Sequence, residues 1–134
     1  MIVVDASVVA NLVGDDGVAG DHARELVRSS GDAVAVPDLV DVESVAVFRR
    51  RWLDRDMTAQ RFREAVDDLV ALPFRRFPVA PLMVRAFELR DNVTAYDACY
   101  VALAEALDAT LVTADARLAA APGLRCRVQL LSDN

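Results

Sequence analysis

Four acidic residues lie beside strongly apolar sequence, and their type and spacing could do chemistry. They are Asp5, Glu43, Asp97 and Asp115. Asp5 follows the β-branched run Ile2-Val3-Val4, which is typical of a strand buried on both faces of a parallel sheet. Asp115 follows a second such run, 110–113. Because ligands of open α/β sheets bind at the carboxyl ends of the strands, both acids are expected at the same edge.

A cluster of carboxylates at this edge would need a cation. Two carboxylates about 4 Å apart repel each other by roughly 1 kcal/mol in water and by more in a drier site. They remain ionised together only beside a positive charge; otherwise some of them take up protons. Oxygen ligands without His or Cys favour Mg²⁺, for which Mn²⁺ can substitute, over Zn²⁺. Ser7 and Thr113, each two residues from one of the acids, could orient the carboxylates or metal-bound water by hydrogen bonds.

Each acid also has an ordinary structural interpretation, which the sequence leaves open. Asp5 and Asp115 each stand before an expected helix, where Asp commonly caps the first turn. Asp97 follows Thr94 by three residues, which is the spacing of a capping box. Glu43 could pair with an arginine two turns along its own helix, Arg50.

The elements expected around these residues alternate between strands and helices. Strands are expected at 2–4, 33–36, 110–113 and 128–131, with an ambiguous edge strand at 74–79. Helices are expected at 7–13, 21–30, 39–53, 58–72, 81–90, 94–107 and 116–120. This order predicts one α/β domain over residues 1–134, with a central, mostly parallel sheet of four to five strands flanked by about seven helices.

The apolar spacing predicts which faces of two helices are buried. Asp38 is expected to cap helix 39–53, and Thr58 to cap helix 58–72. The expected inner face of the first helix consists of Leu39, Val42, Ala46 and Leu53, with Glu43 in the same stripe. The expected inner face of the second consists of Phe62, Val66, Leu69 and Val70.

Composition limits the class of protein. The 134 residues are 54% hydrophobic, which suits a domain with a sizeable core, and no apolar run approaches the roughly 20 residues of a membrane span. The N-terminus lacks the basic leader of a signal peptide. Cys99 and Cys126 are isolated and expected to be reduced, so a cytoplasmic location is predicted.

The charge pattern excludes two other classes. A net charge of −6 argues against a broad nucleic-acid-binding surface held by charge alone. All fifteen basic residues are Arg. Receiver domains and haloacid-dehalogenase-type phosphatases also place Asp after a first strand, but they usually need a Lys, and this chain has none. Arginines that could hold phosphates at the rim of the site are Arg49, Arg50, Arg51, Arg75 and Arg76.

Taken together, the motifs resemble a known family. The matching segments are Ile2-Val3-Val4-Asp5-Ala6-Ser7, Pro37 with Glu43, Thr94-Ala95-Tyr96-Asp97-Ala98, and Thr113-Ala114-Asp115-Ala116-Arg117-Leu118. In their order, spacing and overall length they resemble PIN-domain ribonuclease toxins of the VapC type, from VapBC toxin–antitoxin modules.

The resemblance implies a function and partners. It implies Mg²⁺- or Mn²⁺-dependent hydrolysis of an RNA phosphodiester, in tRNA or ribosomal RNA, by catalytic residues Asp5, Glu43, Asp97 and Asp115. The first, third and fourth of these would hold the metal, with Ser7 and Thr113 in support. It also implies a VapB-type antitoxin and a homodimer. The alternatives are a PIN-domain ribonuclease of RNA processing or decay, or a catalytically silent PIN-like binding module.

Overall fold

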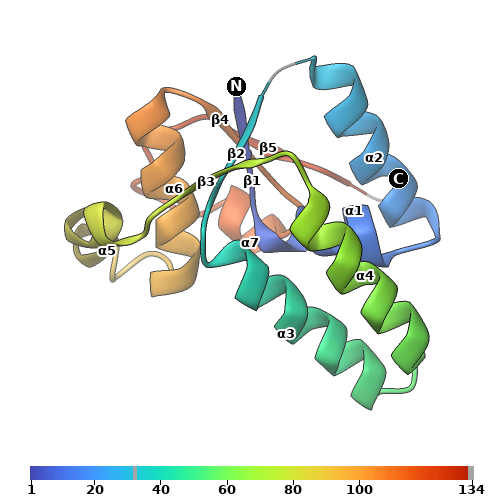
Figure 1. Cartoon of the computed structure of the whole chain (residues 1–134). Coiled ribbons are helices and arrows are strands. Elements are labelled where there is room, and N and C mark those ends of the chain that lie inside the picture. The colour runs from blue at the N-terminus through green and yellow to red at the C-terminus, as the bar shows by residue number, and fades with distance from the viewer. Residues whose placement is uncertain (32, 133–134) are drawn as a thin grey trace.

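A five-stranded parallel sheet forms the centre of the molecule (Figure 1). The computed structural model describes residues 1–31 and 33–132. The strands are β1 (Ile2–Val4), β2 (Val34–Pro37), β3 (Arg75–Phe77), β4 (Thr110–Thr113) and β5 (Val128–Leu130), in the order β3-β2-β1-β4-β5. All four strand pairs are parallel. The predicted fold class is therefore confirmed, with the ambiguous segment 74–79 forming an edge strand.

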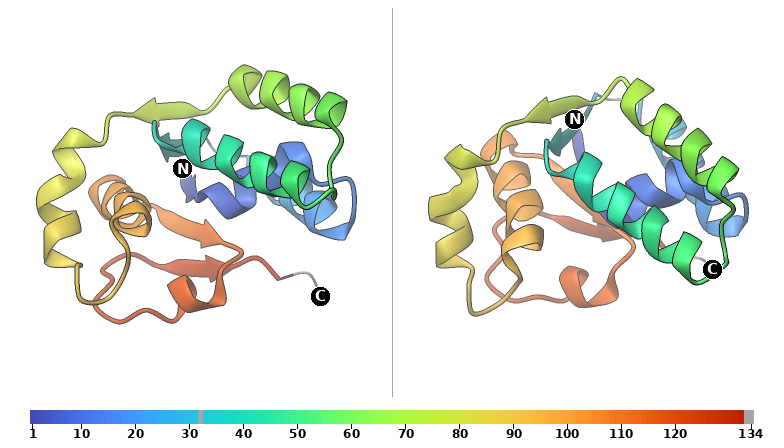
Figure 2. Two further views of the ribbon diagram at one scale, coloured as in Figure 1. Left: turned by 90° about the horizontal axis from the view of Figure 1, so that it is seen from below. Right: turned by 60° about the horizontal axis from the view of Figure 1, so that its bottom comes forward.

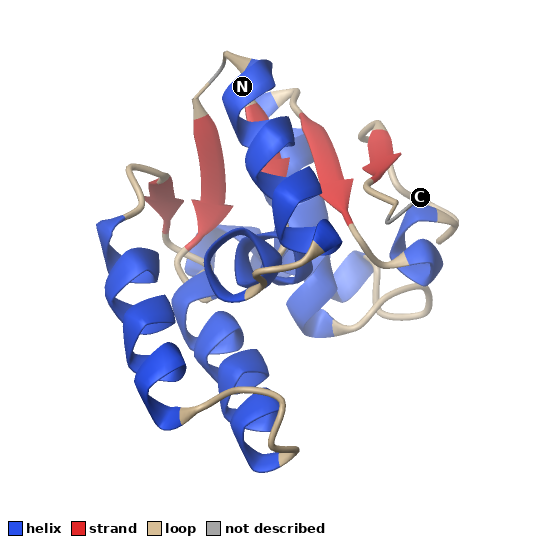
Figure 3. Ribbon diagram, turned by 90° about the vertical axis from the view of Figure 1, so that its right-hand side faces the viewer, coloured by secondary structure: helices blue, strands red, loops and turns tan. Residues whose placement is uncertain are grey.

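Helices cover both faces of this sheet (Figures 1 and 3). Within the described residues they are α1 (Ala6–Gly14), α2 (Val18–Ser30), α3 (Val40–Leu53), α4 (Ala59–Ala71), α5 (Met83–Glu88), α6 (Ala95–Leu107) and α7 (Ala116–Ala119), with a 3₁₀ turn at Ala80–Leu82. Helix α6 packs against β1, β2 and β4, and α2 lies on the opposite side of the sheet. No helix among them has both the length and the apolar character to cross a bilayer. Cys99 and Cys126 are free thiols, as expected.

The central strands are buried because their residues are apolar on both faces. Val3 and Val4 of β1 and Leu111 and Val112 of β4 have no exposed surface. The outer strand β3 carries Arg75 and Arg76, and Pro78 follows it. Charged residues and proline are typical of an edge strand, which pairs with a neighbouring strand on one side only. Parallel strands end on one side, so the residues after β1 and β4 meet at the same edge.

Helix α3 buries a different face from the one predicted. Its buried residues are Val40, Ser44 and Phe48, whereas Val42 is 75% exposed and Leu53 47% exposed. The reason is tertiary: the Phe48 ring packs where Gly14 of α1 has no side chain, and a Cβ at Gly14 would lie 2.5 Å from Phe48 Cε1. Figure 2 shows α3 and α4 running side by side away from the sheet.

Two further local predictions are wrong and two are confirmed. Asp38 does not cap α3: the helix begins after Leu39, without a side-chain cap. Val70 of α4 is exposed, because Ala65 and Leu69 form the buried face. Thr58 caps α4 and Thr94 caps α6, each accepting a hydrogen bond from a backbone N–H three residues on.

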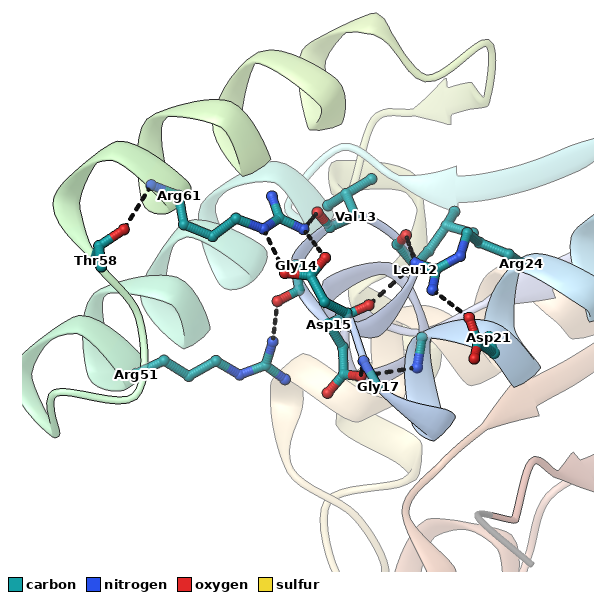
Figure 4. Close-up of polar contacts among 12 residues, drawn as sticks. Leu12, Val13, Gly14, Asp15, Gly17, Asp21, Arg24, Arg51, Thr58 and Arg61 are labelled. Carbon is teal, nitrogen blue, oxygen red and sulfur yellow. Dashed lines mark hydrogen bonds and ion pairs between the residues drawn. The ribbon is translucent and has the colours of Figure 1, made fainter.

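The carboxyl end of α1 is fixed by arginines from three other helices (Figure 4). Arg24, Arg51 and Arg61 come from α2, α3 and α4 and donate to main-chain carbonyls of its last turn. Those carbonyls belong to Leu12, Gly14 and Val13, at 3.1, 3.3 and 2.9 Å respectively. Positive charge suits this end of a helix, and α1 has no basic residue of its own there.

Candidate active site

Asp5 lies at the centre of the site, at the end of β1 and the start of α1. It is 4% exposed. Its Oδ1 accepts hydrogen bonds from Ser7 Oγ at 2.5 Å and from the Val8 backbone N–H at 3.2 Å, and its Oδ2 accepts one from Thr113 Oγ1 at 2.5 Å. The capping interpretation is therefore correct, but it accounts for only one of three contacts.

Thr113 and Ser7 join the two central strand ends into one network. The Thr113 hydroxyl also accepts a hydrogen bond from the Asp115 N–H at 3.0 Å, and Ser7 Oγ accepts one from the Ala114 N–H at 3.1 Å. The turn after β4 is therefore tied to the start of α1 across more than 100 residues of sequence. Both side chains that the sequence predicted as supports contact Asp5 directly.

The acids on the other helices face the same edge. Asp97 lies in the first turn of α6 and is half-buried. Burial raises the pKa of Asp97, and the charges of Asp5 and Asp115 raise it further, against the opposing effects of Thr94 and Arg117. Asp97 and Asp115 also line the same groove at this edge of the sheet.

Glu43, from the first turn of α3, completes the group. Its Oε1 accepts a hydrogen bond from the hydroxyl of Tyr100 at 2.9 Å. Burial raises the pKa of Glu43, the Tyr100 hydrogen bond opposes this, and the charges of Asp97 and Asp5 raise it again. The predicted alternative, a Glu43–Arg50 pair, is not formed, because Arg50 pairs with Asp54 at 3.2 Å.

Tyr100 is a site residue that the sequence analysis missed. Its side chain is almost fully buried, and burial, together with the Glu43 carboxylate, raises the pKa of its hydroxyl. It therefore stays protonated and acts as a donor. The available signal was its position three residues after Asp97, which places both on one face of α6.

The pKa of Asp5 depends on burial, hydrogen bonds and the charge of Asp115. Burial raises the pKa of Asp5, its three hydrogen bonds oppose this, and the charge of Asp115 adds to the rise. Asp115 caps α7 by accepting a hydrogen bond from the Arg117 N–H at 2.9 Å. Asp115 thus lines a groove with Asp97, while Glu43 is linked to α6 through the hydroxyl of Tyr100.

The donor set fits a hard divalent cation held partly by water. No three His, Cys, Asp or Glu side chains among residues 1–31 and 33–132 form a ready-made metal-binding group. Mg²⁺, however, keeps several waters and often binds through one or two carboxylates. Burial and neighbouring charges raise the pKa values of Asp5, Glu43 and Asp97, and a divalent ion would offset this cost of keeping them ionised together.

Most of the arginines predicted at the rim are engaged elsewhere. Arg76 forms a bidentate pair with Asp41, at 2.8 and 2.9 Å, and Arg51 binds the end of α1. Arg75 lies over the ring of Phe77. The arginine that reaches the acids is instead Arg117, whose Nε is 3.8 Å from Asp115 Oδ1.

Fold and site together define a parallel α/β domain with an acidic centre at the carboxyl edge of its sheet. Residues 2–124 match the model of the PIN domain family. The chain belongs to this family.

Relatives of known designation cover nearly the whole chain. Ribonuclease VapC1 of Mycobacterium tuberculosis is 41% identical over 130 residues, 96% of each chain. Ribonuclease VapC9 of the same organism is 42% identical over 132 residues, 98% of each chain. The predicted family is confirmed.

Solved structures share the fold at low identity. The crystal structure of M. tuberculosis VapC20, described as a sarcin-ricin loop cleaving toxin, aligns with a TM-score of 0.71 and 21% identity, covering 95% of this chain and 99% of that one. VapBC2 from Rickettsia felis, bound to a DNA fragment from its promoter, aligns with a TM-score of 0.67 and 15% identity, covering 97% and 98%.

Proposed function

We propose that the protein is a metal-dependent endoribonuclease and the toxin of a type II toxin–antitoxin module. The observation that carries this proposal is the buried Asp5 carboxylate, held by three donors at the strand ends where the charges of Glu43, Asp97 and Asp115 converge. Burial of several acids together is costly, and a structural role alone does not require it.

The residues have distinct roles in this proposal. Asp5, Asp97 and Asp115 hold a Mg²⁺ or Mn²⁺ ion, directly or through water, and Glu43 orients water or a second ion. When bound, the ion supplies an activated water and offsets negative charge on the phosphate. Ser7 and Thr113 fix the orientation of Asp5, because both of its oxygens are occupied by short hydrogen bonds.

Tyr100 has a positioning role in the same proposal. Its hydroxyl donates to Oε1 of Glu43 and so favours the ionised carboxylate in a half-buried position. The other carboxylate oxygen of Glu43 has no protein hydrogen bond in the described part of the chain and is free to accept one from water.

The partners follow from the relatives. The VapC1 and VapC9 relatives are named ribonucleases, and the R. felis neighbour is a VapBC assembly. We assign to this chain an RNA substrate, tRNA or ribosomal RNA, and a VapB-type antitoxin. The designation of VapC20 as a sarcin-ricin loop cleaving toxin favours ribosomal RNA as the first substrate to test. A homodimer and a cytoplasmic location complete the proposal.

The substitution Asp5→Asn tests the function. It removes one charge and keeps the side-chain shape, so cleavage of total bacterial RNA with Mg²⁺ should be abolished, and growth arrest on induction should be relieved. Asp67→Asn on the exposed face of α4 removes the same charge away from the site and should leave both unchanged. Undiminished cleavage by a folded Asp5→Asn protein would contradict the proposal.

A further inference from the structure

A groove of about 480 Å³ opens beside two of the acids. One wall is the loop between α5 and α6, with Arg90 and Asn92, and the other is α7, with Arg117. Asp97 and Asp115 line it where it meets the acidic centre. The groove therefore leads, between Arg90 and Arg117, from the surface to the acidic residues of the proposed metal site.

Arg117 is available to bind an anion from outside the chain. Its side chain is 96% exposed, and its Nε lies 3.8 Å from Asp115 Oδ1. The other arginine–carboxylate pairs in the described part of the chain have separations of 3.2 Å or less. A guanidinium has five N–H donors, so this loose pair leaves most of them unused.

Arg90 is held in place without a carboxylate partner. Its guanidinium carbon lies 4.2 Å from the centre of the Phe87 ring, and its Nη1 donates to the Phe87 carbonyl at 3.0 Å. No carboxylate lies within ion-pair distance of it in the portion of the chain that is described. Stacking orders the guanidinium while leaving its outer edge free, which lowers the entropy cost of binding an anion.

Arg90 and Arg117 lack the close carboxylate partner that about half of the arginines have. Seven of the fifteen arginines are neutralised by close carboxylates within the described residues. One cation without a carboxylate partner and one in a loose pair, both next to acidic residues, are suited to a ligand whose negative charges are spaced along a chain. Asp91 also lines the groove, and its negative charge opposes the attraction of a polyanion by the two arginines.

We propose that this groove binds the RNA backbone on one side of the cleaved bond, with Arg90 and Arg117 each contacting a phosphate. This assignment rests on the nuclease function proposed above. Neither arginine touches the reacting atoms, so they are substrate-positioning residues. Arginine suits this role because its planar fork matches phosphate oxygens in pairs.

The salt dependence of RNA binding tests the assignment. All proteins carry Asp5→Asn to prevent cleavage, the probe is a fluorescein-labelled pool of single-stranded RNA of random sequence, and Kd is measured at fixed Mg²⁺ with increasing KCl. Each phosphate contact on a single strand contributes about 0.7 to the slope of log K against log salt. Arg117→Gln and Arg90→Gln should each lower the slope by about 0.7, and the double variant by about 1.4.

Two controls separate phosphate binding from a structural effect. Arg127→Gln removes the same charge just before β5. This position is at the amino ends of the strands, whereas the groove is at their carboxyl ends, so the slope should be unchanged. Arg117→Lys should retain the slope, because the charge remains. Equal melting temperatures show that each variant is folded. If Arg117→Gln does not fold, the RNA affinity of Arg117→Lys is compared with that of the parent protein instead.

The outcomes distinguish this inference from the proposed function. If unsubstituted protein cleaves RNA but both glutamine variants keep the parent slope, the groove assignment is overturned and the nuclease function stands. If the slope falls equally in Arg127→Gln, the contacts are not local to the groove and the assignment is also overturned. If unsubstituted protein neither binds nor cleaves RNA, both proposals fail.

Discussion

Replacing Thr113 by Val tests how the site holds Asp5. Thr113 has no exposed surface, and its hydroxyl both donates to Asp5 Oδ2 and accepts from the Asp115 N–H. Val has nearly the same shape, so packing is preserved while both hydrogen bonds are lost. A hydrogen bond to a charged group contributes about 1.5–3 kcal/mol and a neutral one about 0.5–1.5 kcal/mol.

The expected loss in the free energy of unfolding is about 2–4 kcal/mol, which corresponds to a fall in Tm of roughly 5–15 °C. Activity should respond as well. The Thr113 hydrogen bond lowers the pKa of Asp5 against the effect of burial, so its removal raises that pKa further. Since the ionised carboxylate is the proposed ligand, the acid limb of the pH–rate profile should move to higher pH.

The assay is thermal unfolding followed by RNA cleavage across pH, with Thr113→Ser as the matched control. Ser keeps the hydroxyl and loses only a methyl group, so its pH profile should match that of unsubstituted protein. A Thr113→Val protein with unchanged Tm and unchanged pH profile would refute the role of this hydroxyl in holding Asp5.

Three further predictions concern the same acids. Tyr100→Phe should cost about 1–2 kcal/mol of unfolding free energy and slow cleavage, because Glu43 loses its donor and its pKa rises; an unchanged pH–rate profile would contradict this. The pKa values of Asp5, Glu43 and Asp97 are raised in the folded state, so their contribution to stability is present below their unfolded pKa and is lost as pH rises through the folded pKa. In EDTA, denaturant titrations should therefore show the free energy of unfolding increasing as pH falls from 7 toward the folded pKa values of these acids. A steady decrease in this free energy as pH falls would count against the crowded site. Mn²⁺ should raise the Tm of the protein at pH 7. At a hundredfold excess of Mn²⁺ over Kd, the free energy of unfolding should rise by as much as about 2.7 kcal/mol, and the rise should be much smaller for Asp5→Asn.

The sequence by itself determined the features that depend on neighbouring residues. The β-branched runs before Asp5 and Asp115 gave the two central strands, and Thr58 and Thr94 marked two helix starts. Because parallel strands end at one edge, the meeting of Asp5 and Asp115 followed without any knowledge of packing. Hydrogen bonds that close within three residues are encoded locally.

The tertiary structure alone decided what depends on residues distant in sequence. Phe48 of α3 packs against Gly14, and in this orientation of the helix part of the predicted apolar face is exposed. The same orientation brings Glu43 into hydrogen-bond contact with Tyr100, 57 residues away in sequence. The choice of acid for each arginine was decided in the same way, which is why Arg117, rather than Arg76, stands at the site. Periodicity shows that a helix has an apolar face, but only the shapes of the packed elements determine which face is buried.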